Sequence, residues 1–236
     1  MNNIITKFNA YDFWAVMLPG VIFVATIILL FQWNTTNDIS FYTLNSLSNI
    51  VTFVFISYFA GIILQEAGSI IQKWVLFHRG EPSDIFLSAK NKMLSKNQKS
   101  FFTRYILVGP FKNIDVESTA DNRMVFNHMN AYLSIVGLSE KCDKIQALFG
   151  LSRGLLCSSL INLLFVASLW LFYSGNVYNR NILLSLLMCA IVSVILYRRT
   201  YRYATIRVKN VCQFYFTKLN QDNFQKIVKW DGEYYN

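Results

Sequence analysis

The segment Ile182–Lys209 has the sequence ILLSLLMCAIVSVILYRRTYRYATIRVK, and its two halves differ sharply. The first sixteen residues, Ile182–Tyr197, carry no charge, whereas five Lys or Arg residues follow before the segment ends. An uncharged apolar run close to 20 residues long is typical of a helix that crosses a bilayer. Positive charge directly after such a run marks its cytoplasmic end. The segment therefore predicts a membrane helix that leaves the bilayer on the cytoplasmic side.

Three other runs have the same character, namely Phe13–Phe31, Ile50–Gln72 and Leu155–Tyr173. Across the 236 residues, 54% are hydrophobic and only 15% are charged, whereas globular domains average about 25% charged residues. These numbers predict an all-α integral membrane protein with four transmembrane helices and a helical cytoplasmic domain. Within the first run, Pro19 predicts either a helix that begins near it or a kink. A kink frees a backbone carbonyl, which a neighbouring group must satisfy.

The basic residues are distributed very unevenly over the four predicted loops and ends. Met1–Asp12, Lys73–Arg153 and the tail Arg198–Asn236 together hold 21 of the 22 Lys and Arg residues. The positive-inside rule then places both termini and the long middle segment in the cytoplasm. The resulting division is 1–72 for the first two membrane helices, 73–154 for a cytoplasmic helical domain, 155–197 for the last two membrane helices and 198–236 for a basic tail helix.

The cytoplasmic segments are predicted to be mostly helical. Ser83 is the expected N-cap of one helix that continues to Phe102, Tyr105–Val108 is expected to be extended, and Ala120–Lys141 is predicted to be helical with an interruption at Gly137. The tail continues the fourth membrane helix and is amphipathic, with an apolar face formed by Ala204, Val208, Val211, Tyr215, Phe216 and Leu219. That face is expected to pack on the middle segment or on the same helix of a neighbouring subunit.

Polar residues inside the predicted spans are the candidates for an ion path. Glu66 is either a pore residue or an interfacial residue, because it lies near the cytoplasmic end of the second run. Ser158 and Asn162, one turn apart on the third helix, line a pore or form hydrogen bonds between helices. Gly61 and Gly68 form a small-residue stripe that suits close helix contacts, within one chain or between subunits.

No strong catalytic or metal-binding motif accompanies these residues. The four cysteines show no C-x-x-C spacing, and His78 and His128 have no visible ligand cluster around them, so no metal and no cofactor is expected. The spacing from Arg123 to His128 matches the R-x4-H pattern of helical RNases called HEPN domains, but a surface arginine and a helical histidine explain it as well. Without a Walker loop or a nucleophile elbow, the chain is not expected to be an enzyme.

The positive charge beyond what orientation requires suggests an anionic partner. One interpretation is attraction to anionic lipid headgroups. The other is a ligand site for a nucleotide or DNA oligomer, in which arginines contact phosphates and interleaved tyrosines stack on bases. The residues predicted for that ligand site are Arg198, Arg199, Arg202, Arg207, Lys209, Tyr201 and Tyr203.

The overall layout, with the opening YDFWAVMLPG at Tyr11–Gly20, resembles small bacterial four-helix membrane effectors of anti-phage defence, with Hailong-type channel effectors as the nearest comparison. Kiwa and retron-linked membrane proteins are similar in layout too. The resemblance implies a multi-pass protein of the bacterial inner membrane and a homo-oligomer, for which we expect a tetramer. It also implies an ion channel that disrupts the membrane potential and is gated by an anionic ligand. The alternative is a non-conducting scaffold that docks a cytoplasmic partner protein.

Overall fold

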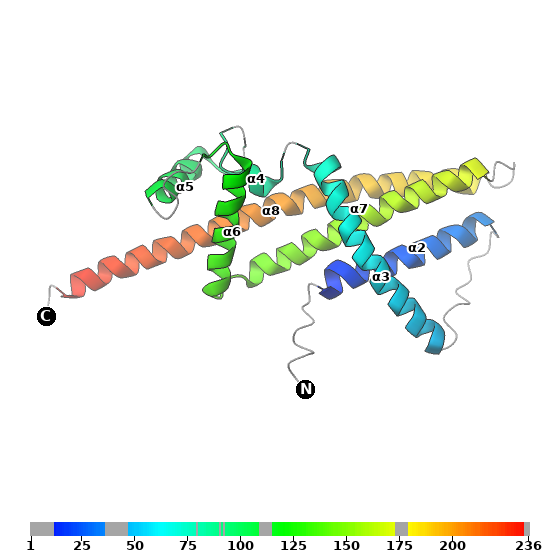
Figure 1. Ribbon diagram of the computed structural model, residues 1–236, viewed down its shortest axis with the longest axis horizontal. Helices are drawn as coiled ribbons and strands as arrows, with labels where there is room; N and C mark the ends of the chain where they lie inside the picture. The colour runs from blue at the N-terminus through cyan, green and yellow to red at the C-terminus, as the bar shows by residue number, and fades with distance from the viewer. Residues whose placement is uncertain are drawn as a thin grey trace. The chain divides into compact units, whose positions relative to one another are not determined.

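The computed structural model describes residues 12–35, 47–78, 80–89, 91, 93–108, 115–172 and 179–233. All regular elements in these ranges are helices, with no strand among them, and Figure 1 shows their course. They are the π-helical turn η1 (Asp12–Met17), α2 (Leu18–Thr35), α3 (Leu47–Ile71), the π-helical turn η3 (Gln72–Leu76), α4 (Pro82–Ile85), α5 (Lys96–Val108), α6 (Thr119–Ile135), α7 (Glu140–Phe172) and α8 (Asn179–Glu233).

The chain divides into two compact units, and we describe each by itself. The first unit holds residues 1–76 and 146–203, and the second holds residues 77–145 and 204–236. Four of the described helices are long and apolar enough to cross a membrane, as the sequence predicts, and the candidate spans lie within Ala15–Gln32, Leu47–Trp74, Glu140–Leu171 and Asn181–Gln221. The 33 residues of α7 and the 55 of α8 both exceed the roughly 20 that one crossing needs. The prediction that the tail continues the fourth apolar helix is confirmed, because α8 is unbroken from Asn179 to Glu233.

Glycines allow the helices of the first unit to touch backbone to backbone. A Cβ added at Gly20 would overlap the Ser57 carbonyl oxygen, and one added at Gly61 would overlap the Val16 carbonyl oxygen. Helix α3 therefore crosses α2 in direct backbone contact, and Figure 1 shows this crossing. Further along α3, a Cβ at Gly68 would lie 3.1 Å from Cγ of Arg153 on α7. Both members of the predicted small-residue stripe are thus used for packing within one chain.

Pro19 explains the irregular start of α2. The ring nitrogen of Pro19 carries no hydrogen, so it cannot bond the Ala15 carbonyl four residues earlier, and residues 12–17 form a π-helical turn. The side-chain Nε2 of Gln65 on α3 donates to the Ala15 carbonyl oxygen and also, at 3.0 Å, to that of Gly150 on α7. One buried amide thereby connects three helices. Helix α2 begins at Leu18, so the alternative that a helix begins near Pro19 is confirmed.

The second unit has its own hydrophobic core around α6 and the second part of α8. The phenyl rings of Phe86 and Phe126 meet edge to face at 6.3 Å between centroids, and Tyr132 meets Tyr215 in the same way at 5.4 Å. On α8 the core residues are Val208, Val211, Cys212, Tyr215 and Leu219, with Phe216 packed against them. The apolar face of the tail therefore packs on the middle segment of the same chain.

The predicted helix from Ser83 to Phe102 is wrong, since the structure has the short α4, a loop and then α5. Side chains hold the backbone between them in a non-helical course: Asn91 donates to the Ile85 carbonyl at 2.9 Å, and the carboxylate of Glu117 accepts the Ala89 amide at 2.9 Å. The Asn91 bond is local and competes with helical bonds, whereas the Glu117 bond comes from a distant part of the chain. In addition, Glu81 rather than Ser83 is the N-cap of α4, and that cap has no side-chain bond.

Two neighbouring expectations have opposite outcomes. Tyr105–Val108 is helical and forms the last turn of α5, so the prediction of an extended segment there is wrong. The last residue of α5, Val108, is followed in the sequence by Gly109 and Pro110. Helix α6 begins one residue before the predicted Ala120 and ends before Gly137, where an interruption was predicted. The Ser118 side chain caps its start by accepting the Asp121 amide. Gly137, at a φ of 74°, follows the end of α6 and supplies the left-handed conformation common there.

Candidate functional site

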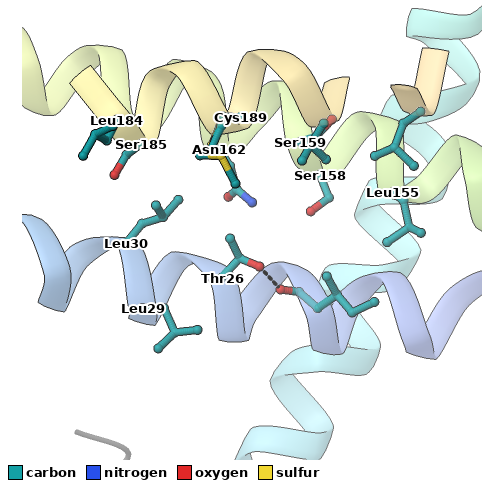
Figure 2. A pocket seen from close by; sticks show the side chains of 14 residues that line it. Thr26, Leu29, Leu30, Leu155, Ser158, Ser159, Asn162, Leu184, Ser185 and Cys189 are labelled. Carbon is teal, nitrogen blue, oxygen red and sulfur yellow. Dashed lines mark hydrogen bonds between the residues drawn. The ribbon is translucent and has the colours of Figure 1, made fainter. Parts of the chain in front are cut away.

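The first unit contains a cavity of about 620 Å³ between α2, α7 and α8. Most of its wall is aliphatic, including Leu29 and Leu30 of α2 and Met188 of α8. The polar groups in the wall come chiefly from α7 and α8, as Figure 2 shows, and they are Ser158, Ser159, Asn162 and Ser185, opposite Thr26 of α2. The structure therefore brings Ser158 and Asn162, two of the predicted pore residues, into one cavity inside a single chain.

Two of the four hydroxyl groups that line this cavity, those of Thr26 and Ser159, are engaged by their own helices. Thr26 donates to the Ile22 carbonyl at 2.6 Å, the bond dashed in Figure 2, and Ser159 donates to the Leu156 carbonyl at 2.9 Å. Ser193 connects α8 to α7 by donating to the Ser159 hydroxyl at 3.1 Å. Asn162 differs from them, because its side chain is 4% exposed and its Oδ1 has no hydrogen-bond partner in the described structure.

Glu66, the third predicted pore residue, lies elsewhere. Its side chain is exposed on α3 among exposed isoleucines such as Ile62 and Ile63, and it does not line the cavity. No basic residue of the described chain forms an ion pair with it. Lys73 follows seven residues later in η3, which is about 10 Å along a helix axis. Glu66 is thus an outward-facing carboxylate near one end of a long apolar helix.

Five of the predicted ligand residues belong to the part of α8 in the first unit. Arg198, Arg199, Tyr201 and Arg202 are exposed. The guanidinium of Arg199 lies 5.4 Å from the ring centroid of Tyr203 and donates to its hydroxyl at 3.2 Å. Tyr203 is therefore partly engaged within the helix. The side chains of Arg198, Tyr201 and Arg202 present a basic surface with an aromatic ring in it.

The other two predicted ligand residues belong to the second unit. The Arg207 guanidinium lies 5.2 Å from the ring centroid of Phe126, a core residue of α6, so Arg207 contributes to the packing of this unit. Lys209 is exposed and lines a smaller cavity of about 250 Å³ together with Gln98, Phe102, Gln213 and Phe216. Of these two, Lys209 is the more accessible cation.

Arg123 and His128 have different surroundings on α6. Arg123 forms an ion pair and two hydrogen bonds with Asp84, whose side chain is 7% exposed. That hydrogen bond raises the pKa of Arg123, and the Asp84 charge adds to the effect. His128 is exposed. The ion pair links α6 to α4, so Arg123 has a structural role.

Cysteines and histidines form no metal site within the described residues. No group of three His, Cys, Asp or Glu side chains in these ranges is close enough to hold an ion. All four cysteines are free thiols, and three of them, Cys142, Cys157 and Cys212, are buried. Cys212 and Cys142 belong to the core of the second unit.

Sequence reasoning missed the polar cluster around Gln65. Arg153 of α7 donates to Oε1 of Gln65 at 2.6 Å and to Oε1 of Gln72 at 3.4 Å, and its guanidinium lies 6.0 Å from the Phe149 ring centroid. A buried amide thus satisfies a cation and a freed carbonyl together. The available signal was two glutamines seven residues apart in an apolar run, which puts both on one helix face.

No known protein family, curated protein or solved structure matches this chain at a significant level.

Proposed function

We propose that this protein crosses the bacterial inner membrane four times and assembles with copies of itself into a pore, which an anionic ligand gates from the cytoplasmic side. The apolar outer surfaces of the long helices support insertion. On α3 and α7 the outward side chains include Phe55, Phe59, Leu164 and Leu171, all more than 60% exposed. So much apolar surface on a water-soluble monomer is unusual, whereas lipid tolerates it.

The orientation follows from charge, with both termini and residues 73–153 in the cytoplasm because 21 of 22 basic residues lie there. Single cysteines in a cysteine-free background test it with a reagent that does not cross membranes. Cysteines at positions 36 and 176 should react from outside the cell, whereas one at position 95 should react only after the cells are opened. External labelling at position 95 would contradict the orientation.

The observation that carries the pore proposal is Glu66 on the outer face of α3. A carboxylate that faces lipid is costly, and such residues in membrane proteins usually face a partner or a water-filled path. In a ring of subunits, the same residue from each copy surrounds one axis. A ring of carboxylates near the cytoplasmic mouth attracts cations, which is how many cation channels select their ions. Gly61 and Gly68 are already packed against residues of their own chain, so their positions need no second subunit. The outward position of Glu66 is the feature that a neighbouring subunit would explain.

Conductance of purified protein in planar bilayers tests this proposal. The wild-type protein should conduct and prefer cations, and Glu66→Gln should lower that preference. Asp143→Asn is the matched control, because Asp143 is an exposed carboxylate in the first turn of α7, outside the apolar part of that helix. Native mass spectrometry should show one discrete oligomer, for which we expect a tetramer. A monomer without conductance would contradict the pore and favour the non-conducting scaffold.

The proposed gating ligand is a nucleotide or DNA oligomer that binds the basic surface of α8, as the resemblance to anti-phage effectors implies. Arg202→Gln with Lys209→Gln should weaken oligonucleotide binding and flatten its salt dependence, because fewer counterions are released. Both residues are exposed, whereas Arg207 packs on Phe126 and is a poor probe. Tyr201→Ala should cost a further 1–3 kcal/mol or so if a base stacks there. Binding that follows anionic lipid content and ignores oligonucleotide would assign the surface to lipid.

A further inference from the structure

We propose that the cavity of about 250 Å³ in the second unit binds a small aromatic carboxylate, a flat ring that carries one negative charge, and that Lys209 pairs with that charge. The loop before α5, α5 itself and α8 form its wall, at Met93, Leu94, Gln98, Phe102, Lys209, Cys212, Gln213 and Phe216. All of these residues belong to the second unit, so the site goes beyond the proposed pore and is complete without a second subunit.

The inner wall of the cavity is apolar and partly aromatic. Leu94, Phe102 and Cys212 are all less than 10% exposed and belong to the core of the second unit. The ring of Phe216 is tilted at 59° to that of Phe102, with 6.2 Å between their centroids. Aromatic rings pack well on one another in tilted or offset arrangements, and a ligand ring placed there removes apolar surface from water. The inner wall therefore favours a ring over a sugar or another polyhydroxylated body.

The outer wall carries one positive charge and no negative one. Lys209, Gln98 and Gln213 are exposed, no Asp or Glu lines the cavity, and no ion pair among the described residues includes Lys209. Oε1 of Gln98 accepts the Ser95 amide at 3.0 Å, which leaves its side-chain NH₂ group as a donor. The ammonium of a lysine can only donate. Donors of this kind suit a carboxylate, whose two oxygens both accept.

Hydrogen bonds within the protein hold the loop that supplies Met93 and Leu94. Oδ1 of Asn91 accepts the Met93 amide at 2.9 Å, and Nζ of Lys99 donates to the carbonyls of Ser88 and Asn91. A site held in its shape before binding loses less binding free energy to ordering. The volume is smaller than that of most ligand pockets, roughly 300–1,000 Å³, so the cavity suits a single ring system rather than a large cofactor.

Photolabelling of the purified full-length protein in nanodiscs, without oligonucleotide, tests the proposal. The probe is 4-azidobenzoate, and the matched probe is 4-azidobenzamide, which keeps the ring and an acceptor oxygen but has no charge. The carboxylate should label peptides that contain Met93, Leu94 or Phe216, and an excess of benzoate should suppress that labelling. The amide should label the same peptides about fivefold less, the loss expected for one exposed ion pair.

Two variants and one control complete the test. Lys209→Gln should reduce labelling by the carboxylate to the level of the amide. Gln213→Trp should block both probes, because it places an indole at the cavity from an exposed position of α8 and leaves the core unchanged. Lys96→Gln is the control, because Lys96 is an exposed lysine of α5 that does not line the cavity, and the difference between the probes should persist.

Three results would overturn the proposal: equal labelling of the parent protein by the two probes, a difference between the probes that survives Lys209→Gln, or labelling that Gln213→Trp leaves unchanged. Oligonucleotide binding to the basic surface of α8 is measured separately, so either proposal can fail while the other stands.

Discussion

Replacing Gln65 with methionine should destabilise the helix packing of the first unit, and the loss should depend on Pro19. Methionine has nearly the length of glutamine but offers no amide. The change removes the donor to the Ala15 and Gly150 carbonyls and the acceptor for Arg153. The Ala15 carbonyl then loses its side-chain donor, and Pro19 cannot supply the N–H of an α-helical bond in its place. Restoring an N–H with Pro19→Ala should recover that part of the loss.

The magnitude follows from the groups left unpaired. An orphaned buried carbonyl costs about 1–3 kcal/mol in water-soluble proteins, and hydrogen bonds between membrane helices average about 0.6 kcal/mol. We therefore expect a coupling of about 1–2 kcal/mol between the two positions. The charge-assisted bonds of Arg153 add a further 1.5–3 kcal/mol or so to the loss from Gln65→Met, and Pro19→Ala should not recover that part.

The assay is a double-mutant cycle in mixed detergent micelles. The free energy of unfolding is measured by SDS titration with far-ultraviolet circular dichroism for the parent, both single variants and the double variant. Gln72→Met is the control partner, because Gln72 accepts from Arg153 at 3.4 Å but lies seven residues along the chain from Gln65, so its change should combine additively with Pro19→Ala. A coupling below about 0.5 kcal/mol between Gln65→Met and Pro19→Ala would refute the account of the freed carbonyl.

Three further predictions concern single substitutions, each measured as a free energy of unfolding. Gly61→Ala should cost more than about 2 kcal/mol, because its Cβ meets backbone, whereas Gly137→Ala should cost about 1 kcal/mol, because only its φ of 74° is strained. Leu133→Ala should cost about 2–5 kcal/mol, because Leu133 is fully buried in the core of the second unit, and a loss below 1 kcal/mol would contradict that packing. Arg123→Ala should cost about 1–2 kcal/mol, because it leaves the buried carboxylate of Asp84 without its ion-pair partner. His128→Ala should cost clearly less, and equal losses in stability would contradict the structural role of Arg123.

The sequence by itself determined the helical class and the four long apolar helices. A continuous apolar stretch with charges only at its ends leaves few alternatives, and the periodicity of the tail predicted the face that Val208, Val211 and Leu219 bury. Local chemistry also determined where α6 ends, since a glycine with positive φ acts within a few residues.

The loop after α4 shows where local patterns fail. Its course depends on Glu117, nearly thirty residues away in the chain, which holds the Ala89 amide. A bond of that kind is invisible to periodicity, so the sequence predicted one unbroken helix there.

Only the tertiary structure decided which polar residues meet inside the first unit. Ser158 and Asn162 share a cavity and Glu66 faces outward, although all three were predicted as pore residues. The junction at Gln65 depends on Ala15 and Arg153, which are 50 and 88 residues away from it in the chain. A sequence pattern records which face of a helix a residue occupies, whereas the partner on that face depends on how the helices cross. In this protein that crossing follows from backbone contact at Gly20 and Gly61.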